Sequence, residues 1–485
     1  MFFQRIFAIA IDGKYGMIKT NRLTGLKRDR HRPEVVRTEL KNRSPSGTGG
    51  IPHRGAGGPP RGKERTGSTM QTLETLGKRA KAAARLLAGA GSQQKNAALQ
   101  AVAQALLDQS EAILAANAAD VAAAKAGGMM PAMIDRLSLT AARIEGMAEG
   151  VRQTAALPDP VGEVIEGFRR PNGLRIRRER VPLGVVGMIY EARPNVTSDA
   201  SALCLKAGNA VLLRGGKEAI RSNIAIAAAI RDGLASEGLP ADAVQLLEDT
   251  SRETASSMMR MNEYLDVLIP RGGAGLIRSV VQNATVPVIE TGTGNCHIYV
   301  DKDADVAMAV SIAVNAKVSR PSVCNAAETL LVHAAVAERA LPAIAAGMRE
   351  HHVELRCCPR AAAILRDMET TAATEEDWAT EYLDYILAVR VVDSLEDALT
   401  HIAQYGTGHS ECIVTDSASA AETFLNRVDA AAVYLNASTR FTDGAEFGLG
   451  AEIGISTQKL HARGPMGLRE LTTTKYIVVG NGQIR

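Results

Sequence analysis

Three absences narrow what this 485-residue chain can be. Its six cysteines form no Cys-x-x-Cys pair and show no paired spacing of metal ligands, so neither a zinc site nor a disulfide framework is expected. They predict reduced thiols in a cytoplasmic protein. No apolar run approaches the roughly 20 residues that a membrane helix needs, and the apolar start is followed too soon by charges to make a good secretory signal. We therefore expect no bound metal and no membrane partner.

The net charge of +3 hides an uneven distribution. Residues 1–69 hold 15 Lys/Arg and 5 Asp/Glu, whereas the remainder holds 41 and 48 and is mildly acidic, so the overall charge does not predict a nucleic-acid partner. The first 69 residues are rich in Arg and then in Gly, Pro and Ser, a composition that buries too little apolar surface to offset its ordering entropy. We expect a disordered basic extension. Residues 1–69 have three alternative interpretations: a nucleic-acid-binding arm, an organelle-targeting peptide, or a stretch upstream of a natural start at Met70.

Strand and helix patterns alternate through the rest of the chain. Leucines at helical spacing in alanine-rich sequence predict several packed amphipathic helices from residue 70 to about 155. A hairpin is expected at 162–180, because Asn172 and Gly173 accept the positive φ of a tight turn; its second arm, with arginines on one face, suits a partner subunit or a solvated edge. Between 181 and 287, short apolar runs alternate with helical stretches, which predicts a parallel, doubly wound sheet. Residues 475–484 predict a strand, a turn and a second strand in the hairpin's sheet.

Two glycine-rich, basic loops follow strands of this series, at 214–218 and 271–275. Each opens a helix, where free N–H groups suit a phosphate. Neither loop is the Gly-x-Gly-x-x-Gly fingerprint, and an ordinary turn is the alternative for each. The candidate cofactor-binding residues here are Arg214, Gly215, Lys217, Arg271, Gly272, Gly273 and Gly275.

Cys324 lies in a polar break between an apolar helical run and a short strand-like run. Pro321 lacks the N–H that a helix needs, so the helix should stop near Arg320 and leave Cys324 in a turn. Close to Arg320 and to fixed backbone amides, the thiol is expected to have a lowered pKa and to react as a thiolate. A small, buried, unreactive cysteine is the alternative.

Glu290 lies at a strand end, before a glycine turn and 34 residues ahead of Cys324, a layout that resembles the aldehyde dehydrogenase superfamily. From about residue 70 to the C-terminus the chain is similar to one family within it, the γ-glutamyl phosphate reductases. The stretches that carry this likeness are 190–195, 319–325, 436–443 and 448–467. The resemblance implies an α/β fold with a Rossmann-like NADP-binding domain (70–289), an α/β catalytic domain (290–455), a segment that returns to the cofactor domain (456–485) and a β-ribbon for oligomerisation.

The same resemblance implies a reaction: NADPH-dependent reduction of L-glutamyl 5-phosphate to L-glutamate 5-semialdehyde, with phosphate release, in proline biosynthesis. Cys324 is then the nucleophile that carries the acyl group as a thioester, and Asn195 donates to the oxyanion. Glu290 fits general-base hydrolysis, proton transfer with Cys324 or a structural role. A non-phosphorylating semialdehyde dehydrogenase is the alternative enzyme, and a nucleic-acid-binding protein recruited through its basic extension is the alternative outside enzymes.

Further charged residues are expected around the cofactor and substrate. Glu381 resembles the acid that contacts the nicotinamide ribose, and two cations, Arg214 and Lys217, favour the 2′-phosphate of NADPH. A substrate with phosphate, carboxylate and ammonium groups needs several partners, for which the candidates are Arg320, Arg193, Arg440, Arg463 and His409. Arg320 is the first candidate for the phosphate. A structural salt bridge is the alternative for Arg193, Arg440 and Arg463, and a scaffold role for the histidine. As protein partners we expect further copies of the chain and a glutamate 5-kinase that supplies the acyl phosphate.

Overall fold

The computed structural model describes the backbone of residues 63–485 and the side chains from residue 73 onward, apart from residue 132. The expected disordered extension therefore falls outside the described residues up to residue 62. Residues 63–69, which the sequence assigned to that extension, already belong to helix α1 (Lys63–Leu87). Within the described range, no helix is both long enough and apolar enough to span a bilayer.

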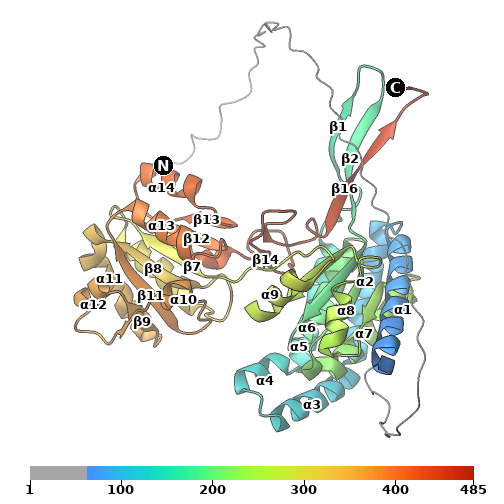
Figure 1. The fold of residues 1–485 in the computed structure, drawn as a ribbon, viewed down its shortest axis with the longest axis horizontal. Coiled ribbons are helices and arrows are strands. Elements are labelled where there is room, and N and C mark those ends of the chain that lie inside the picture. Colours follow the sequence, from blue (N-terminus) through green and yellow to red (C-terminus); the bar gives the residue numbers. More distant parts are fainter. Residues whose placement is uncertain (1–62) are drawn as a thin grey trace, which may run out of the picture. The chain divides into compact units, whose positions relative to one another are not determined.

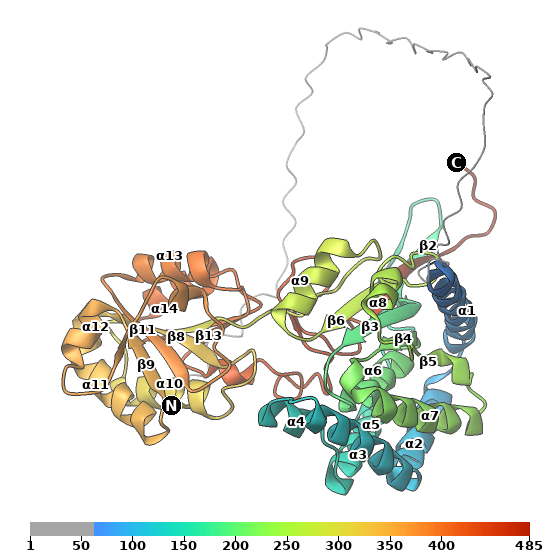
Figure 2. The ribbon, with the colours of Figure 1, turned by 60° about the horizontal axis from the view of Figure 1, so that its bottom comes forward.

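Four more helices follow α1, as the leucine spacing predicts: α2 (Ser92–Asp108), α3 (Ser110–Ala126), α4 (Pro131–Leu137) and α5 (Ala141–Ala156). The start of α5 is fixed by Thr140, whose hydroxyl accepts a hydrogen bond from the Arg143 amide. Buried leucines and alanines of α1, α2 and α5 pack into the core of the first sheet. Helix α2 packs against α5 and α7 (Ile220–Ser236), and α1 packs against strands β4 (Ala210–Arg214) and β5 (Val244–Leu246) (Figure 2).

The first sheet contains four parallel strands in the order β5-β4-β3-β6. Their bounds are β3 (Val185–Tyr190), β4 (Ala210–Arg214), β5 (Val244–Leu246) and β6 (Val267–Arg271). The connecting helices are α6 (Asn195–Lys206), α7 (Ile220–Ser236), α8 (Arg252–Met258) and α9 (Ala274–Asn283). The predicted parallel sheet is confirmed, with β5 as a strand that the sequence patterns did not reveal because it is only three residues long. Both glycine-rich loops lie at the carboxyl ends of strands, where α/β sheets bind ligands.

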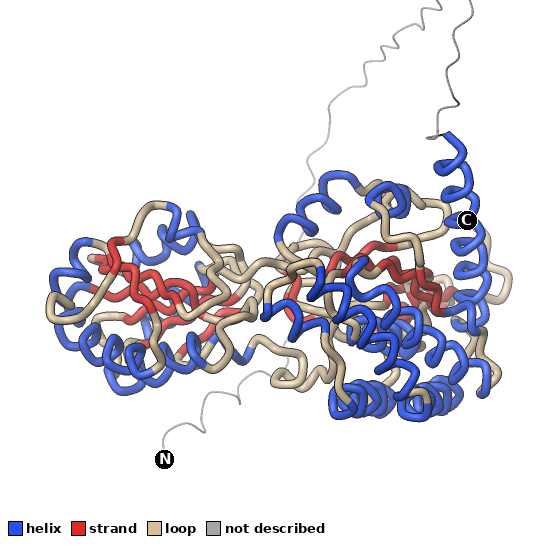
Figure 3. The backbone as a smooth tube through the Cα atoms, turned by 90° about the horizontal axis from the view of Figure 1, so that it is seen from below, coloured by secondary structure: helices blue, strands red, loops and turns tan. Residues whose placement is uncertain are grey.

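The second sheet contains seven parallel strands in the order β10-β9-β11-β8-β7-β12-β13. Figure 3 shows helices in blue on both sides of its strands in red. The strands are β7 (Cys296–Val300), β8 (Ala327–His333), β9 (Glu354–Cys357), β10 (Thr371–Ala372), β11 (Ile386–Val392), β12 (Ser410–Val414) and β13 (Ala432–Leu435). Ile298 and Val300 face the core beneath α10 (Val306–Val318), α11 (Ala334–Glu350) and α12 (Pro359–Ile364). Tyr299 faces the opposite core, under α13 (Leu395–Tyr405) and α14 (Ala418–Arg427). Alternate side chains thus enter opposite cores, and helices cover both faces.

The predicted hairpin and the C-terminal strand form an antiparallel ribbon (Figure 1). Strand β1 (Val164–Arg169) pairs with β2 (Arg175–Pro182), and β2 pairs with β16 (Thr472–Val479). The second C-terminal strand that we expected is wrong, since residues 480–485 form no strand. A short pair, β14 (Ile455–Ser456) and β15 (Gly464–Pro465), precedes β16.

Candidate active site

Cys324 lies at the amino-terminal edge of the seven-stranded sheet, three residues before β8 begins. The segments that precede its neighbours β7 and β11, and the segment before β12 on the far side of β7, contribute Gly294, Glu381 and His409 to the same edge. Because these four strands are adjacent and parallel, their leading segments come together although they span more than a hundred residues of sequence. As predicted, the helix before Cys324 ends ahead of Pro321, at Val318, and Cys324 lies in a turn.

The backbone of this turn is held from several sides. Cys296 donates its S–H to the Cys324 carbonyl oxygen, with 3.2 Å between sulfur and oxygen. Asn325 donates from its side-chain amide to the Thr442 carbonyl (3.0 Å), and its own carbonyl accepts from the Thr439 hydroxyl (2.7 Å). Such satisfied hydrogen bonds fix the direction in which the half-buried thiol points.

The expected lowering of the Cys324 pKa is wrong. The pKa of this thiol is raised to about 11, mainly by burial and also by the charges of Glu381 and Glu452, against the opposing charge of Arg271. The sequence shows a cation, Arg320, close to Cys324. It does not show that the fold brings the Glu381 and Glu452 carboxylates near the thiol or that burial removes water from it. The thiol is therefore neutral at neutral pH, and it must lose its proton before it acts as a nucleophile.

Three arginines, Arg193, Arg271 and Arg440, interact electrostatically with the thiol, and a fourth, Arg320, acts on two of them. Burial and the charges of Arg136, Arg271 and Arg320 lower the pKa of Arg193, while the Cys324 thiol raises it. Burial and the charge of Arg320 likewise lower the pKa of Arg440, again opposed by Cys324. Mutual repulsion of this kind marks a concentration of positive charge, which is the environment that an anionic substrate requires. Three of the four, Arg193, Arg320 and Arg440, are predicted substrate residues, and the fourth was predicted for the cofactor.

Asn195, the predicted oxyanion donor, is the first residue of α6. Its side-chain amide donates one hydrogen bond to the Asp199 carboxylate, at 2.8 Å, which leaves the second N–H available. Burial raises the pKa of Asp199, and the nearby charge of Arg271 opposes that shift. Asp199 thus orients the amide and lies within reach of the charge of Arg271.

The two predicted acids have different surroundings. Glu381 accepts a hydrogen bond from the Gly294 amide at 2.7 Å, and burial raises its pKa. Glu290 donates its backbone N–H to the Gln458 side chain at 2.9 Å, while no residue of the described chain bonds its carboxylate. The acids with the largest effects on the Cys324 thiol are Glu381 and Glu452.

Two predicted substrate residues are engaged elsewhere. Arg463 pairs with Asp429, with 2.8 Å between the guanidinium and carboxylate atoms. His409 is fully buried, its Nδ1 lies 2.8 Å from the Ser410 hydroxyl, and burial lowers its pKa to about 4. Both contacts agree with the structural alternatives that the sequence left open.

The loop after β4 was expected to bind the cofactor. The Arg214 guanidinium donates to the backbone carbonyls of Thr250 and Ser251, and its Nε lacks a partner within the described chain. Lys217 is exposed, and its ammonium pairs with no residue that the structure describes. A Cβ at Gly215 would lie 2.1 Å from the Asn223 side-chain amide, so only glycine keeps this backbone open. One free cation and an open backbone fit a phosphate-bearing cofactor.

In the loop after β6, Gly273 precedes the first turn of α9 without any side-chain cap. No atom lies within 4 Å of a Cβ built at Gly273 or Gly275, so the backbone is open to a ligand. Gly272 approaches Glu191 closely, and the Arg271 guanidinium packs against Gly454, toward the thiol rather than along the loop. The glycines of this loop therefore fit a pyrophosphate, whereas Arg271 joins the arginine cluster.

A sequence model of the aldehyde dehydrogenase family matches residues 64–358. This chain belongs to the aldehyde dehydrogenase family. It is 63% identical over 413 residues to the γ-glutamyl phosphate reductases of Moorella thermoacetica and Heliobacterium modesticaldum, matches that cover 85% of this chain and 98% and 99% of those proteins. The crystal structure of γ-glutamyl phosphate reductase from Thermotoga maritima is 50% identical, with a TM-score of 0.84 over 85% of this chain and 99% of that one. The resemblance found in the sequence and the predicted fold class are confirmed.

Sequence reasoning missed several titratable residues of this family member. Burial raises the pKa of Glu452 to about 7, and its Oε2 has no partner among the described residues. Lys317, which precedes Cys324 in the sequence, forms a buried ion pair with Glu328, which follows it. Glu452 lies inside the 448–467 stretch that carries the family likeness, and Glu328 interrupts an apolar strand, so the signals existed but could not be interpreted without neighbours in space.

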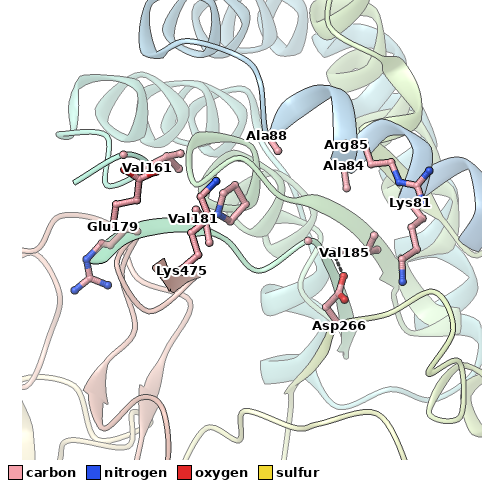
Figure 4. A pocket seen from close by; sticks show the side chains of 14 residues that line it. Lys81, Ala84, Arg85, Ala88, Val161, Glu179, Val181, Val185, Asp266 and Lys475 are labelled. Atoms are coloured by element: carbon pink, nitrogen blue, oxygen red, sulfur yellow. Dashed lines mark hydrogen bonds between the residues drawn. The ribbon is translucent and has the colours of Figure 1, made fainter. Parts of the chain in front are cut away.

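A hollow of about 470 Å³ lies between α1, β2 and β16 (Figure 4). Lys81 and Arg85 of α1 line it with Lys475 of β16, and its floor includes Val185, the first residue of β3. Strand β3 runs from this floor to Tyr190, five residues before Asn195, so the hollow lies at the end of the sheet opposite the candidate active site. No group of three His, Cys, Asp or Glu side chains in the described part of the chain is arranged to hold a metal ion.

Proposed function

We propose that this chain catalyses the NADPH-dependent reduction of L-glutamyl 5-phosphate to L-glutamate 5-semialdehyde, with release of phosphate, in proline biosynthesis. The observation that carries this proposal is the placement of one half-buried cysteine among four arginines, in a chain closely similar to γ-glutamyl phosphate reductases. An acyl phosphate needs both a soft nucleophile for its carbonyl carbon and positive charge for its phosphate.

The chemistry assigns a role to each group. The Cys324 thiol loses its proton, its sulfur attacks the acyl carbon, and the bond from that carbon to the phosphate oxygen breaks, which leaves a thioester and inorganic phosphate. Asn195 and the Cys324 backbone N–H donate to the oxyanion. When bound, the nicotinamide cofactor supplies the hydride that reduces the thioester carbon. The tetrahedral oxyanion then expels the Cys324 sulfur, which recovers a proton, and the aldehyde leaves.

Glu452 suits the proton exchange with Cys324 better than Glu290 does. Its pKa of about 7 lets it take up and release a proton near neutral pH, and its charge acts on the thiol. The predicted role of Glu290 in this exchange has no comparable support. The proposed reaction needs no general base for hydrolysis, because hydride rather than water resolves the thioester.

We further propose NADPH as the cofactor and an oligomeric enzyme. The unpaired Lys217 suits the additional 2′-phosphate, whereas Arg214 is partly committed to backbone carbonyls. The ribbon exposes apolar side chains on β1 and β16, which suits a contact with another copy of the chain: Val164, Ile165, Phe168, Tyr476 and Val478. The glutamate 5-kinase partner stays a prediction.

The reverse reaction tests the proposal. Purified enzyme is given glutamate 5-semialdehyde with NADP or NAD, with and without inorganic phosphate, and reduced cofactor is followed by absorbance. We expect turnover only with phosphate, a preference for NADP, and no turnover by Cys324→Ala. Phosphate-independent oxidation would instead identify a non-phosphorylating dehydrogenase, and full activity of Cys324→Ala would overturn the mechanism.

A further inference from the structure

Lys317 and Glu328 form an ion pair that water does not reach. The Lys317 Nζ lies 2.5 Å from the Glu328 Oε2, and both side chains are 0% exposed. A buried pair of this kind stabilises a fold less well than apolar residues of the same size, because both charges lose their hydration. Stability alone therefore does not account for it.

The position of the pair in the chain is informative. Lys317 lies in the last turn of α10, seven residues before Cys324, and Glu328 lies in β8, four residues after it. The ion pair thus joins the two ends of the turn that carries the nucleophile. A closed loop restricts the backbone between its ends, so the pair limits how far Cys324 can move.

Glu328 also reaches the segment that presents Glu381. Its other oxygen, Oε1, accepts a hydrogen bond from the Leu383 amide at 3.2 Å. Leu383 has a φ of 58°, an unfavourable backbone conformation for leucine, which persists only where neighbours hold it.

The chain of contacts then returns to the nucleophile. Glu381 accepts from the Gly294 amide at 2.7 Å, and Gly294 lies directly against the backbone of Cys324, where a Cβ would lie only 1.5 Å from the Cys324 carbonyl oxygen. Glu328, Leu383, Glu381, Gly294 and Cys324 therefore form a closed set of contacts.

We infer that Lys317 and Glu328 are a positioning pair, which sets the distance and direction between the Cys324 thiol and the Glu381 carboxylate. Neither residue acts on the substrate directly. The inference rests on the proposed function in one respect: the reaction whose rate the pair affects is the proposed reduction. The charged and titratable groups that also act on the pair are Glu381, Asp384 and Cys296, and Tyr382 places its ring 5.9 Å from the Lys317 Nζ.

Three variants of the full-length enzyme test the inference. Glu328→Gln keeps the shape and an acceptor for Leu383 but removes the charge. The double variant Lys317→Met/Glu328→Leu removes both charges and restores apolar packing, which relieves the cost of an unpaired charge. Asp393→Asn, which breaks the exposed pair between Asp393, just after β11, and Arg360 of α12, is the matched control. Each is assayed below its own Tm for kcat and for KM of both substrates.

A positioning role lowers kcat at least tenfold in Glu328→Gln and in the double variant, with KM changed less than threefold, even where the double variant recovers the wild-type Tm. A purely structural role would let kcat recover together with the Tm, and that result would overturn the inference. Asp393→Asn is expected to keep wild-type kcat.

A second readout does not depend on the reaction. The rate at which iodoacetamide alkylates Cys324, followed by mass spectrometry, is expected to rise at least fivefold in Glu328→Gln and in the double variant, because the loosened turn exposes the thiol. An unchanged alkylation rate in both variants would overturn the inference, whichever substrate the wild-type enzyme reduces. If the wild-type enzyme is inactive on glutamyl phosphate, that result contradicts only the proposed function.

Discussion

Replacing Arg271 by glutamine is expected to slow the alkylation of Cys324. Burial raises the pKa of the thiol to about 11, and Arg271 is the cation that opposes this shift most strongly. At pH 8 only about one thiol in a thousand is ionised, since each unit between pH and pKa is a factor of ten. An opposite charge nearby shifts a pKa by about 1–3 units, so loss of Arg271 should lower the thiolate fraction at least about tenfold.

The assay measures the second-order rate of alkylation by iodoacetamide between pH 7 and 10. For the wild-type enzyme we expect the rate to rise about tenfold per pH unit throughout, because the thiolate is the reactive form and the pKa lies above this range. Arg271→Gln should give a parallel line about tenfold lower, and Arg271→Lys should restore most of the rate because it keeps the charge. A wild-type rate that levels off below pH 8 would refute the reasoning, since it would show a thiol with a lowered pKa.

Three further changes test other parts of the site. Gly294→Ala should lower kcat about 100-fold, because its Cβ would collide with the Cys324 carbonyl. The control is Gly146→Ala, because no atom lies within 4 Å of a Cβ built at this helical position. This variant should keep kcat and add up to about 1 kcal/mol to the free energy of unfolding measured in urea. Near wild-type kcat in Gly294→Ala would contradict the close approach. Lys217→Ala should raise KM for NADPH about tenfold and leave KM for NADH unchanged. An equal rise in both KM values would contradict the contact between Lys217 and the 2′-phosphate. Asn195→Ala should lower kcat by about 10²–10³ in steady-state assays, with a smaller loss arguing against its oxyanion role.

The sequence predicted those parts of the fold that local rules govern. Short apolar runs that alternate with helical stretches located β3, β4, β6 and the helices around them, and Pro321 correctly ended α10 before the nucleophile turn. Asn172 and Gly173 located the hairpin because their backbone preference is intrinsic. The false strand after residue 480 shows the opposite case: a strand needs a partner, and residues 480–485 pair with no strand even though β16 lies at the edge of the ribbon.

Cys324 became a candidate nucleophile through its turn and through family likeness, and both belong to the sequence. Its ionisation depends instead on which groups the tertiary structure brings within reach and on how much water it removes. Glu381 and Glu452 are 57 and 128 residues away along the chain, yet both raise the pKa of the thiol. Lys317 and Glu328 flank the cysteine in sequence, but only the fold shows that they meet without water between them. The sequence therefore determined the fold class and the identity of the reacting atom, while the tertiary structure decided its protonation state and its partners, because electrostatic interactions depend on distance and burial rather than on order along the chain.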